Sequence, residues 1–328
     1  MMIKENSSKP NILISKCITF DACRWNGIKI NDAFVDQLKE FVNFIPVCPE
    51  VEIGLGCPRH PIRIVQSKET GKISLIQPAT DLDCTEKMSE FSKKFISTLI
   101  EPDGIIFKAK SPSCGPQKVS YYKYKDKADT MDHGPGLFAK EVFEKFPNVP
   151  TEDEGRLHAF AIREIWLIRV FTNHRFKTEV VAAASVNALI KFHSQHKYLL
   201  MAFNQDMLRT MGHVVAKASK QNIEDDIKEY KSLLEKSLQE EFRHAGLINA
   251  IDHVYGYFKK DLKKSEKDYF FDSMEEFRRG GLPLSVPISL LNSWAIRFDA
   301  KYIEDQILLR PYPKELDLVT DSGHGRKL

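Results

Sequence analysis

Short apolar runs alternate with stretches of helical periodicity along the first half of the chain. Continuous apolar runs at 11–15, 44–47 and 104–109 predict buried strands. Between them, residues 31–44 and 85–99 carry apolar side chains at the spacing of an amphipathic helix. Strands that alternate with helices indicate a parallel α/β sheet.

The pattern changes at 146–155, where two prolines and three acidic residues interrupt the apolar periodicity. We place the boundary between two domains, residues 1–150 and 151–328, at this segment. Apolar side chains then recur with helical spacing and without strand alternation over 156–176, 180–203, 223–242 and 286–297. The predicted fold class is therefore an α/β parallel-sheet N-terminal domain followed by an all-α C-terminal domain.

Composition narrows the class of protein. The 328 residues suffice for two ordinary domains, and the 42% hydrophobic and 28% charged residues are typical of a globular protein. No apolar run approaches the roughly 20 residues of a membrane helix, and the start lacks the apolar core of a secretory signal. We therefore expect a cytoplasmic protein without membrane contact. The net charge of +3 is spread over both halves, so any RNA contact requires a local basic patch.

The placement of the cysteines points to chemistry in the first domain. All six lie within residues 1–114. In a cytoplasmic protein such clustering favours metal or redox chemistry over disulfides, and six small buried apolar side chains are the plainer alternative. Cys17, Cys48 and Cys114 each follow a predicted strand, and the carboxyl ends of parallel strands meet at one crevice. We therefore expect these three thiols to converge.

Three thiolates are too few for a closed structural zinc site, which takes four ligands. They suit a 4Fe–4S cluster with one iron left open, because four cysteines would saturate it. Cys23 and Cys57, in loops beside Arg24 and Arg59, are each open candidates for a fourth ligand. Cys84, at the start of a predicted helix, is a position that suits a small apolar side chain.

Several motifs of the first domain are found together in one known family. They are Ser15-x-Cys17, Arg24-Trp25-Asn26-Gly27, Val47-Cys48-Pro49-Glu50-Val51, Gly54-Leu55-Gly56-x-Pro58-Arg59, Asp83-x-Thr85 and Lys110-Ser111-Pro112-Ser113-Cys114-Gly115. This series resembles the thiouracil desulfidases, the TudS family. The second domain resembles the YbgA-type helical family through Glu154-Gly155-Arg156-Leu157, Phe192-His193-x-x-His196-Lys197-Tyr198 and Pro313-Lys314-Glu315-Leu316. Together they are similar to the fused, RudS-like tRNA 4-thiouridine desulfidases.

The resemblance implies removal of sulfur from 4-thiouridine in tRNA, or from a related thiouracil, with release of hydrosulfide. It also implies that Cys17, Cys48 and Cys114 hold a 4Fe–4S cluster whose open iron takes the sulfur of the substrate. The chain departs from the family at two places. Trp25-Asn26 stands where the family often has Tyr-Asp, so a carboxylate is missing, and Cys84 stands where an apolar residue is usual.

Residues close to these cysteines suit a hydrolytic reaction. A thiocarbonyl is a soft ligand for iron in a sulfide cluster, and its binding there invites attack by water on the ring carbon. Glu50, two residues after Cys48, is the best-placed base for that water, and pairing with a neighbouring Arg is the alternative. Ser113 and Ser111 are candidates for hydrogen bonding to the base or for proton relay; otherwise they close the turn before Cys114.

Candidate RNA contacts lie in both domains. Arg24 and Arg59 are candidate phosphate or base contacts, with surface ion pairing as the alternative. A basic stretch, expected to be helical, is either an RNA backbone contact or a solvated face. It contains Lys259, Lys260, Lys263 and Lys264. His193 and His196 share one face of a predicted helix without further ligands at helical spacing, which favours a packed or RNA-facing polar seam over a metal site.

Two functions from different classes are compatible with these residues. The first is an iron–sulfur desulfidase that acts on thiouridine in tRNA, or on a thiolated nucleobase or nucleoside. The second is a non-catalytic RNA-binding protein in which the cysteines hold a structural metal ion. Visible colour of anaerobically purified protein separates them, because an iron–sulfur cluster absorbs visible light and zinc is colourless.

Overall fold

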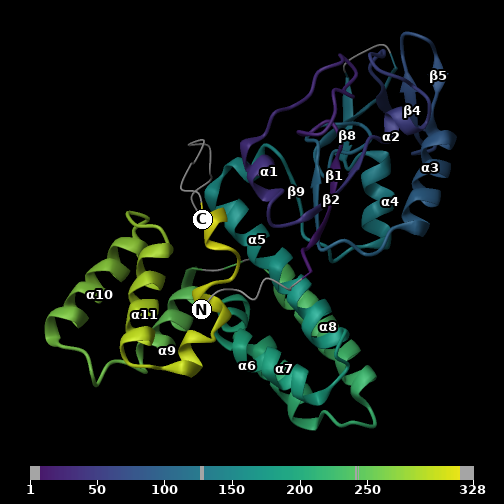
Figure 1. Cartoon of the computed structure of the whole chain (residues 1–328). Helices are drawn as coiled ribbons and strands as arrows, with labels where there is room; N and C mark the ends of the chain where they lie inside the picture. Colours follow the sequence, from purple (N-terminus) through teal and green to yellow (C-terminus); the bar gives the residue numbers. More distant parts are fainter. Residues whose placement is uncertain (1–7, 126–128, 241, 243, 318–328) are drawn as a thin grey trace. The chain divides into compact units, whose positions relative to one another are not determined.

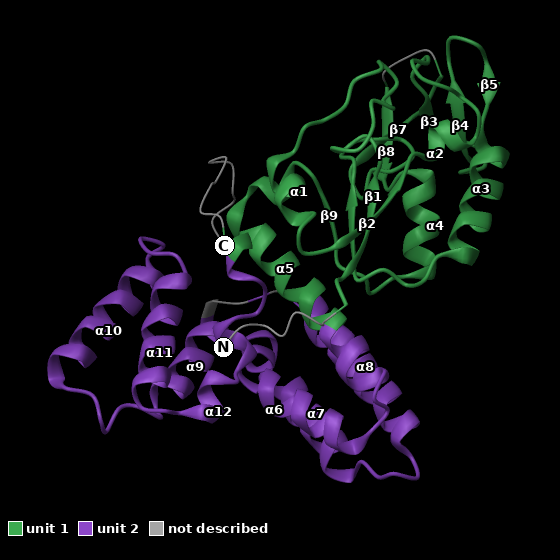
Figure 2. Cartoon of the chain, viewed as in Figure 1, with its two compact units in different colours: residues 1–174, 315–327 green, residues 175–314, 328 purple. Residues whose placement is uncertain are grey.

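The computed structural model of the chain describes residues 8–125, 129–240, 242 and 244–317 (Figure 1). The ends of the predicted domain ranges, residues 1–7 and 318–328, lie outside the described residues. The described part divides into two compact units (Figure 2). Unit 1 runs to His174 and takes in residues 315–317, and unit 2 comprises Arg175–Lys314.

A four-stranded parallel sheet forms the centre of unit 1. Its strands, in the spatial order β2-β1-β6-β9, are β2 (Asn43–Val47), β1 (Asn11–Ser15), β6 (Gly104–Phe107) and β9 (Thr151–Asp153). The residues of β6 are all buried, and so are those of β1 after its first residue. Such continuous apolar strands are typical of a parallel sheet with both faces covered. The prediction of a parallel α/β domain is confirmed.

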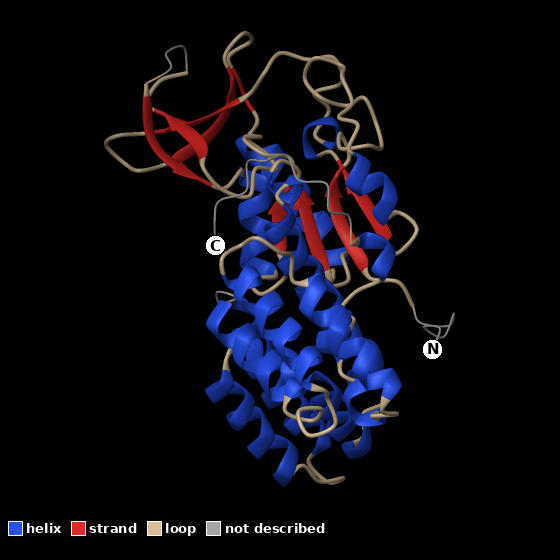
Figure 3. Ribbon diagram, turned by 90° about the vertical axis from the view of Figure 1, so that its left-hand side faces the viewer, coloured by secondary structure: helices blue, strands red, loops and turns tan. Residues whose placement is uncertain are grey.

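A second, mixed sheet in unit 1 was not expected from the sequence (Figure 3). Its strands, in spatial order, are β5 (Leu82–Asp83), β4 (Ile73–Gln77), β3 (Arg63–Gln66), β7 (Val119–Tyr122) and β8 (Thr130–Gly134). Only the β3–β7 pairing is parallel. These strands have at most five residues, and four residues of β8 are exposed, so they carry little of the hydrophobic pattern that marks a strand.

Helices cover both faces of the parallel sheet. The helices of unit 1 are α1 (Ala33–Leu38), α2 (Pro49–Glu52), α3 (Thr85–Thr98), α4 (Leu137–Lys145) and α5 (Phe160–Arg175). Residues of α3 and α4 pack against Leu13, Ile105 and Phe107 on one face. Helix α5 lies against the other face at Gly104, where an added Cβ would meet Val170 at 2.6 Å. Only glycine therefore permits this close approach.

The segment after the predicted boundary at residue 150 belongs to unit 1. Residues Thr151–Asp153 form β9, which pairs with β6, and α5 follows within the same unit. The carbonyl of Pro150 accepts hydrogen bonds from the Ile105 amide at 2.9 Å and the Trp166 indole at 3.1 Å. The expected all-α region thus begins with one short polar strand, which is too short to show alternation.

Unit 2 is helical. It contains α6 (Val186–Phe203), α7 (Gln205–Lys217), α8 (Ile223–Gln239), α9 (His244–Tyr255), α10 (Lys264–Arg278), α11 (Ser285–Arg297) and α12 (Lys301–Glu304). A π-helical turn (Phe176–Val181) separates α5 from α6, and the Ser185 side chain caps α6. Helices α7, α9 and α12 were not predicted, and of α10 only the start, at the end of the basic stretch, was expected to be helical. No helix in the described ranges is both long and apolar enough to cross a membrane.

Candidate active site

The three predicted cluster ligands lie at one edge of the parallel sheet. Cys17 follows β1, Cys48 follows β2, and Cys114 ends the loop after β6, and these three strands are neighbours in the sheet. All three cysteines line one pocket of about 360 Å³ in unit 1. Cys23 lines the same pocket, so four thiols are gathered there. Each of the four residues is only 4% to 8% exposed.

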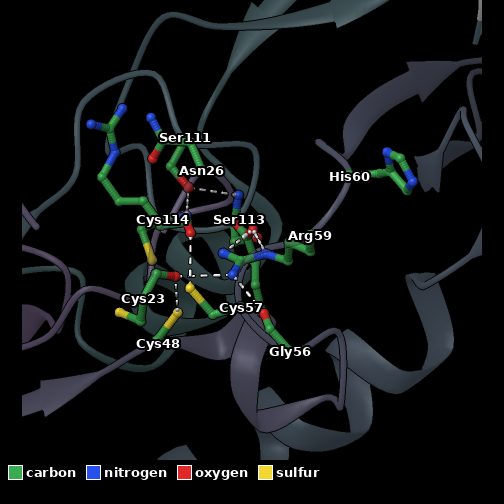
Figure 4. A network of polar contacts seen from close by, with 12 residues as sticks. Cys23, Asn26, Cys48, Gly56, Cys57, Arg59, His60, Ser111, Ser113 and Cys114 are labelled. Atoms are coloured by element: carbon green, nitrogen blue, oxygen red, sulfur yellow. Dashed lines mark hydrogen bonds and ion pairs between the residues drawn. The ribbon is translucent and has the colours of Figure 1, made fainter. Parts of the chain in front are cut away.

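The thiols in the pocket are neighbours (Figure 4), and the surroundings of Cys23, Cys48 and Cys114 oppose their ionisation. The hydrogen bond with the Cys17 thiol raises the pKa of Cys23 to about 11. The hydrogen bond with Cys23, together with burial, raises the pKa of Cys48. Burial raises the pKa of Cys114, against a hydrogen bond with Ser15 that lowers it. A cation that binds these last three thiols must therefore displace protons from them.

Tight local structure holds Cys48 and Cys114 in place. Cys48 is the N-cap residue of α2, and Pro49 begins that helix. The Ser111 hydroxyl accepts hydrogen bonds from the backbone amides of Ser113 at 3.2 Å and Cys114 at 3.1 Å. A Cβ on Gly115 would lie 2.3 Å from Val119. Ser111 thus closes the turn that presents Cys114, which is the structural alternative that the sequence left open.

Glu50 is fixed at the pocket wall by an ion pair and a hydroxyl. Arg59 donates to Oε2 of Glu50 from Nε at 2.8 Å and from Nη2 at 2.6 Å. The Ser113 hydroxyl donates to Oε1 at 3.0 Å. Burial opposes the charge on Arg59, but the Glu50 carboxylate outweighs it and raises the pKa of Arg59. Ser113 is fully buried and is not among the pocket-lining residues, so it lies behind Glu50.

The two arginines proposed as RNA contacts lie in different surroundings. The side chain of Arg59 is 4% exposed, and besides Glu50 it also donates to the carbonyls of Cys23 and Gly56, both at 2.9 Å. This pairing replaces the phosphate contact that the sequence suggested, because all three nitrogens of the guanidinium are engaged. Arg24 lines the pocket, and its guanidinium has no partner among the described residues. Trp25, 47% exposed, lines the pocket beside it.

The sequence analysis did not assign site roles to two residues that line the pocket, Ser15 and Trp25, or to Glu154, which contacts the lining residues Lys108 and Ala109. Ser15 is buried, and its hydroxyl accepts a hydrogen bond from the Lys108 amide at 2.9 Å. Glu154, just after β9, accepts from the Ala109 amide at 2.8 Å and pairs with the Lys108 ammonium. Trp25 was noted only as a departure from a family pattern. The signal for Ser15 and Glu154 was their position at the carboxyl ends of β1 and β9.

The remaining two cysteines lie outside the pocket wall. The Cys57 thiol donates to the carbonyls of Ala22 at 2.9 Å and Arg24 at 3.2 Å, and the residue is exposed. Cys84 is completely buried in the hydrophobic core with residues such as Leu75 and Met88. The position of Cys84 therefore agrees with the small apolar role expected for it.

The candidate groups of the helical domain lie in unit 2. His193 bonds to the Tyr230 hydroxyl at 3.1 Å, and His196 is fully buried against Phe192. The four lysines of the basic stretch are exposed: Lys259, Lys260, Lys263 and Lys264. Lys259 and Lys260 lie in the turn between α9 and α10 and not on a helix, because α9 ends at Tyr255 and α10 begins at Lys264.

The donor chemistry of the pocket fits the implied cluster. Thiolates are the usual ligands of a 4Fe–4S cluster, and each binds a different iron, so the donors spread around the cluster. A single ion instead requires its donors around one point. Within the ranges that the structure describes, no three His, Cys, Asp or Glu side chains are placed around one point in that way.

Two protein families match the chain in succession. Residues 12–154 match the family described as 2-thiouracil desulfurase, and residues 197–313 match a family described as a protein of unknown function, DUF1722. YbgA of Escherichia coli (strain K12), an uncharacterized protein, is 24% identical over 153 residues, covering 46% of this chain and 90% of YbgA. YbbK of Bacillus subtilis (strain 168), also uncharacterized, is 32% identical over 111 residues, covering 32% of this chain and 72% of YbbK.

A solved structure is also similar to part of the chain. It is described as the 4Fe-4S-dependent thiouracil desulfidase TudS, is 23% identical, and covers 45% of this chain and 93% of TudS with a TM-score of 0.35. A parallel α/β unit with thiols at the carboxyl edge of its sheet, followed by a helical unit, defines the class of this protein. The chain belongs to the 2-thiouracil desulfurase family, and a DUF1722 domain is fused behind the family domain.

Proposed function

We propose that the chain converts 4-thiouridine in tRNA, or a related thiouracil, to the oxygen-containing base and releases hydrosulfide. The observation that carries this proposal is the gathering of Cys17, Cys48 and Cys114 beside Glu50 in one pocket. Family membership and the activity by which TudS is described support it. Water supplies the new carbonyl oxygen and the protons that leave with sulfur, so no electron donor is required.

Each residue of the site has a distinct proposed role. Cys17, Cys48 and Cys114 hold a 4Fe–4S cluster, which when bound supplies a soft Lewis acid for the substrate's sulfur. Glu50 takes a proton from the attacking water through Oε1, the oxygen that Arg59 leaves free. Ser113 positions that oxygen by its hydrogen bond from behind, and Ser111 positions Cys114.

Substrate contacts are proposed for two pocket residues, Trp25 and Arg24, whose side chains have no polar partner among the described residues. The exposed ring of Trp25 offers a surface on which a pyrimidine stacks. The guanidinium of Arg24, without a partner in the described part of the chain, is suited to a phosphate or to a carbonyl of the base. These two contacts recognise a nucleotide and do not by themselves require a polynucleotide.

Recognition of tRNA is proposed for unit 2. Its four exposed lysines form no ion pair with any described side chain. Three exposed aromatic side chains lie close to them in the sequence: Tyr257 (51% exposed), Tyr269 (62%) and Phe271 (52%). Lysines that meet phosphates and rings on which bases stack are the two components of single-stranded RNA binding.

The full chain, loaded anaerobically with iron and sulfide, tests this function. Thiolated tRNA, the 4-thiouridine nucleoside and free 2-thiouracil are supplied in turn, and released hydrosulfide is measured against the sulfur lost from the base. We expect equal amounts of both, with the highest kcat/KM on tRNA. Release from the small substrates alone would refute the tRNA part of the proposal. A chain that takes up the cluster and releases no hydrosulfide from any of the three would refute desulfidase activity.

A further inference from the structure

A second cavity, of about 420 Å³, lies within unit 2 and takes no part in the proposed reaction. One wall is a face of α6, on which Asn187, Lys191 and Ser194 recur at spacings of four and three residues. The other wall is formed by Tyr302 of α12 and by Gln306, which follows that helix. Ligand sites combine the surface of a ring or an aliphatic chain with a few fixed polar groups, and this cavity has that composition.

Gln306 is a fixed polar group with an unused acceptor. The residue is 2% exposed, and its Nε2 donates to the carbonyls of Ser194 at 3.0 Å and Tyr302 at 3.2 Å. These two bonds join α12 to α6 and set the orientation of the side-chain amide. Its Oε1 has no hydrogen-bond partner among the described residues. A buried acceptor without a donor is costly, and because Gln306 lines the cavity, a ligand with an N–H group is suited to supply the donor.

The other groups of the cavity define the chemistry of that ligand. Asp305 is an exposed carboxylate, and the cation paired with it, Lys301, is 3.7 Å away and is shared with Glu304 at 3.4 Å. An ionised carboxylate only accepts hydrogen bonds, so it also calls for N–H donors. The ring of Tyr302 is 39% exposed, and the exposed ammonium of Lys191 has no ion-pair partner among the described residues. The matching ligand therefore has a planar ring, neighbouring N–H groups and an anionic group.

A guanine nucleotide has all three features. On its Watson–Crick edge, N1–H and the N2 amino group are adjacent donors, and no other common base presents two adjacent donors on that edge. Proteins read single-stranded RNA through such edges, with the ring stacked on an aromatic side chain. The phosphate supplies the anionic group.

The cavity adjoins the aromatic and basic groups for which RNA recognition is proposed. The rings of Tyr302 and Tyr257 have centroids 5.9 Å apart. Tyr257 is 51% exposed and lies two residues before Lys259 of the basic stretch. An RNA strand that meets these lysines can therefore place one of its bases in the cavity.

We propose that the cavity between α6 and α12 binds a guanine nucleotide, as one residue of the RNA that unit 2 recognises. This inference rests on the RNA recognition proposed for unit 2. Asp305 accepts from N1–H and from one proton of the N2 amino group, and Oε1 of Gln306 accepts from the other. The base stacks on Tyr302, and Lys191 meets the phosphate.

Photolabelling of the full-length chain locates the nucleotide. The chain is irradiated with 8-azido-GMP, and the labelled peptides are identified by mass spectrometry. We expect the label within residues 186–203 or 301–309. GMP should displace it at a concentration about tenfold or more below that required of AMP, CMP or UMP, because each well-placed pair of hydrogen bonds discriminates between bases by about that factor.

Two substitutions in the cavity test the contacts. Asp305→Asn keeps the size of the side chain but turns one acceptor into a donor, so the preference for GMP should disappear. Asp272→Asn, in an exposed aspartate of α10 outside the cavity, is the matched control and should keep it. Tyr302→Phe preserves the ring and should retain binding of GMP, whereas Tyr302→Ala should weaken it about 5- to 140-fold through loss of stacking. Circular dichroism of each variant checks that the helices are intact.

Competition by RNA identifies the source of the guanine. Unmodified tRNA or poly(U) is added to the photolabelling reaction at equal nucleotide concentration. Both polymers bring phosphates to the lysines, but only tRNA contains guanine, so we expect displacement of the label by tRNA at a much lower concentration than by poly(U).

Three results would overturn the inference: label outside the two segments, equal displacement by all four mononucleotides, or a preference for GMP that survives Asp305→Asn. Displacement by GMP but not by tRNA would overturn the RNA assignment and identify a site for a free guanine nucleotide. None of these measurements depends on turnover, so the release of hydrosulfide decides the proposed desulfidase activity separately.

Discussion

Units 1 and 2 both bury polar side chains, but in different surroundings. In unit 1, Glu50, Arg59 and Ser113 satisfy one another at the wall of a pocket that four thiols line. In unit 2, His196 is fully buried, and its ring lies 3.7 Å from that of Phe192. Its Nδ1 bonds to the Phe192 carbonyl, and its Nε2 has no partner among the described residues.

This difference shows what a buried polar group indicates. The buried groups of unit 1 are mutually paired and adjoin a cavity, which is the arrangement of a site that must hold a charged group in place. His196 adjoins aromatic rings, and burial lowers its pKa to about 3, with Arg175 contributing in the same direction. It is therefore a neutral member of a core. The two regions can be compared by removing one group at a time.

Removal of a cluster ligand should have the largest effect. We expect Cys17→Ala, Cys48→Ala and Cys114→Ala each to abolish the visible absorption of the cluster and the release of hydrosulfide, because no thiolate remains for one iron. Cys84→Ala, a cysteine of the core, is the control and should retain both. Iron content and turnover are measured on the same anaerobic samples. A complete, active cluster in any of the first three variants would remove that residue from the ligand set.

The Glu50→Gln variant should have the next largest effect. Glutamine keeps the shape of the side chain but accepts no proton at neutral pH, so turnover should fall about 10²–10⁴-fold while the cluster remains. The substitution also leaves the buried charge of Arg59 unpaired, which costs about 3–5 kcal/mol of stability.

Arg59→Gln provides the matched control for this loss of stability. It breaks the same ion pair but keeps the carboxylate. Unfolding free energy and turnover are measured for both variants. If Glu50 is the base, turnover falls much further in Glu50→Gln than in Arg59→Gln at a similar loss of stability. Equal turnover in the two variants would assign Glu50 a structural role only.

The parts of the fold that the sequence predicted are those with strong local patterns. The apolar run at 11–15 is β1, which is buried after its first residue, and a buried strand of a parallel sheet carries no polar interruptions. The run at 44–47 is β2 with one added residue, although only Val47 of β2 is buried. The strands of the second sheet are short and partly exposed, and β9 is polar. Their pairing depends on partners distant in the sequence.

The candidate site also has a part that the sequence could predict and a part that it could not. The convergence of Cys17, Cys48 and Cys114 could be predicted because each follows a strand of one sheet. The sequence left pairing of Glu50 with a neighbouring Arg open as an alternative, because which arginine reaches the carboxylate depends on the path of the loop between Glu50 and Arg59. Whether Cys23 or Cys57 lines the pocket depends on which side chain turns toward it, and both lie in loops.

Charge reversal in unit 2 tests whether the helical unit recognises RNA. The four substitutions to Glu are made together at Lys259, Lys260, Lys263 and Lys264. We expect weaker turnover of thiolated tRNA and unchanged turnover of 2-thiouracil, because phosphate contacts serve only the polynucleotide. The slope of the logarithm of the tRNA binding constant against the logarithm of the salt concentration should also become shallower. We expect a change of about 0.9 for each lysine that no longer neutralises a phosphate.

A reversal of equal charge in unit 1 is the control. It uses four exposed lysines of α3 and α4: Lys87, Lys93, Lys94 and Lys145. The ratio of tRNA turnover to free-base turnover is compared among the wild type and both variants. The same ratio in all three would exclude RNA recognition by the basic stretch of unit 2, and an equal fall in both variants would indicate a general effect of charge.

The smallest expected effect is a dependence of the stability of unit 2 on pH. His196 has a pKa of about 3 in the folded chain, against about 6.5 in the unfolded chain. Between these values the unfolded state binds a proton that the folded state excludes. Stability should therefore fall as the pH decreases from about 6.5 toward 3, by at most about 1.4 kcal/mol per pH unit from this residue. Hydrogen exchange of α6 amides, corrected for the intrinsic effect of pH on exchange, measures this change.

Two variants separate His196 from other groups that titrate in the same range. His196→Gln removes the ionisable ring and should make the protection of α6 less dependent on pH between 6.5 and 5. His213→Gln removes an exposed histidine of α7 and should leave the dependence unchanged, because solvent reaches that ring in the folded and unfolded chain alike. If His196→Gln shows the pH dependence of the wild type, His196 is not the group that excludes the proton. The contrast between a sealed core in unit 2 and a paired polar site in unit 1 would then require another explanation.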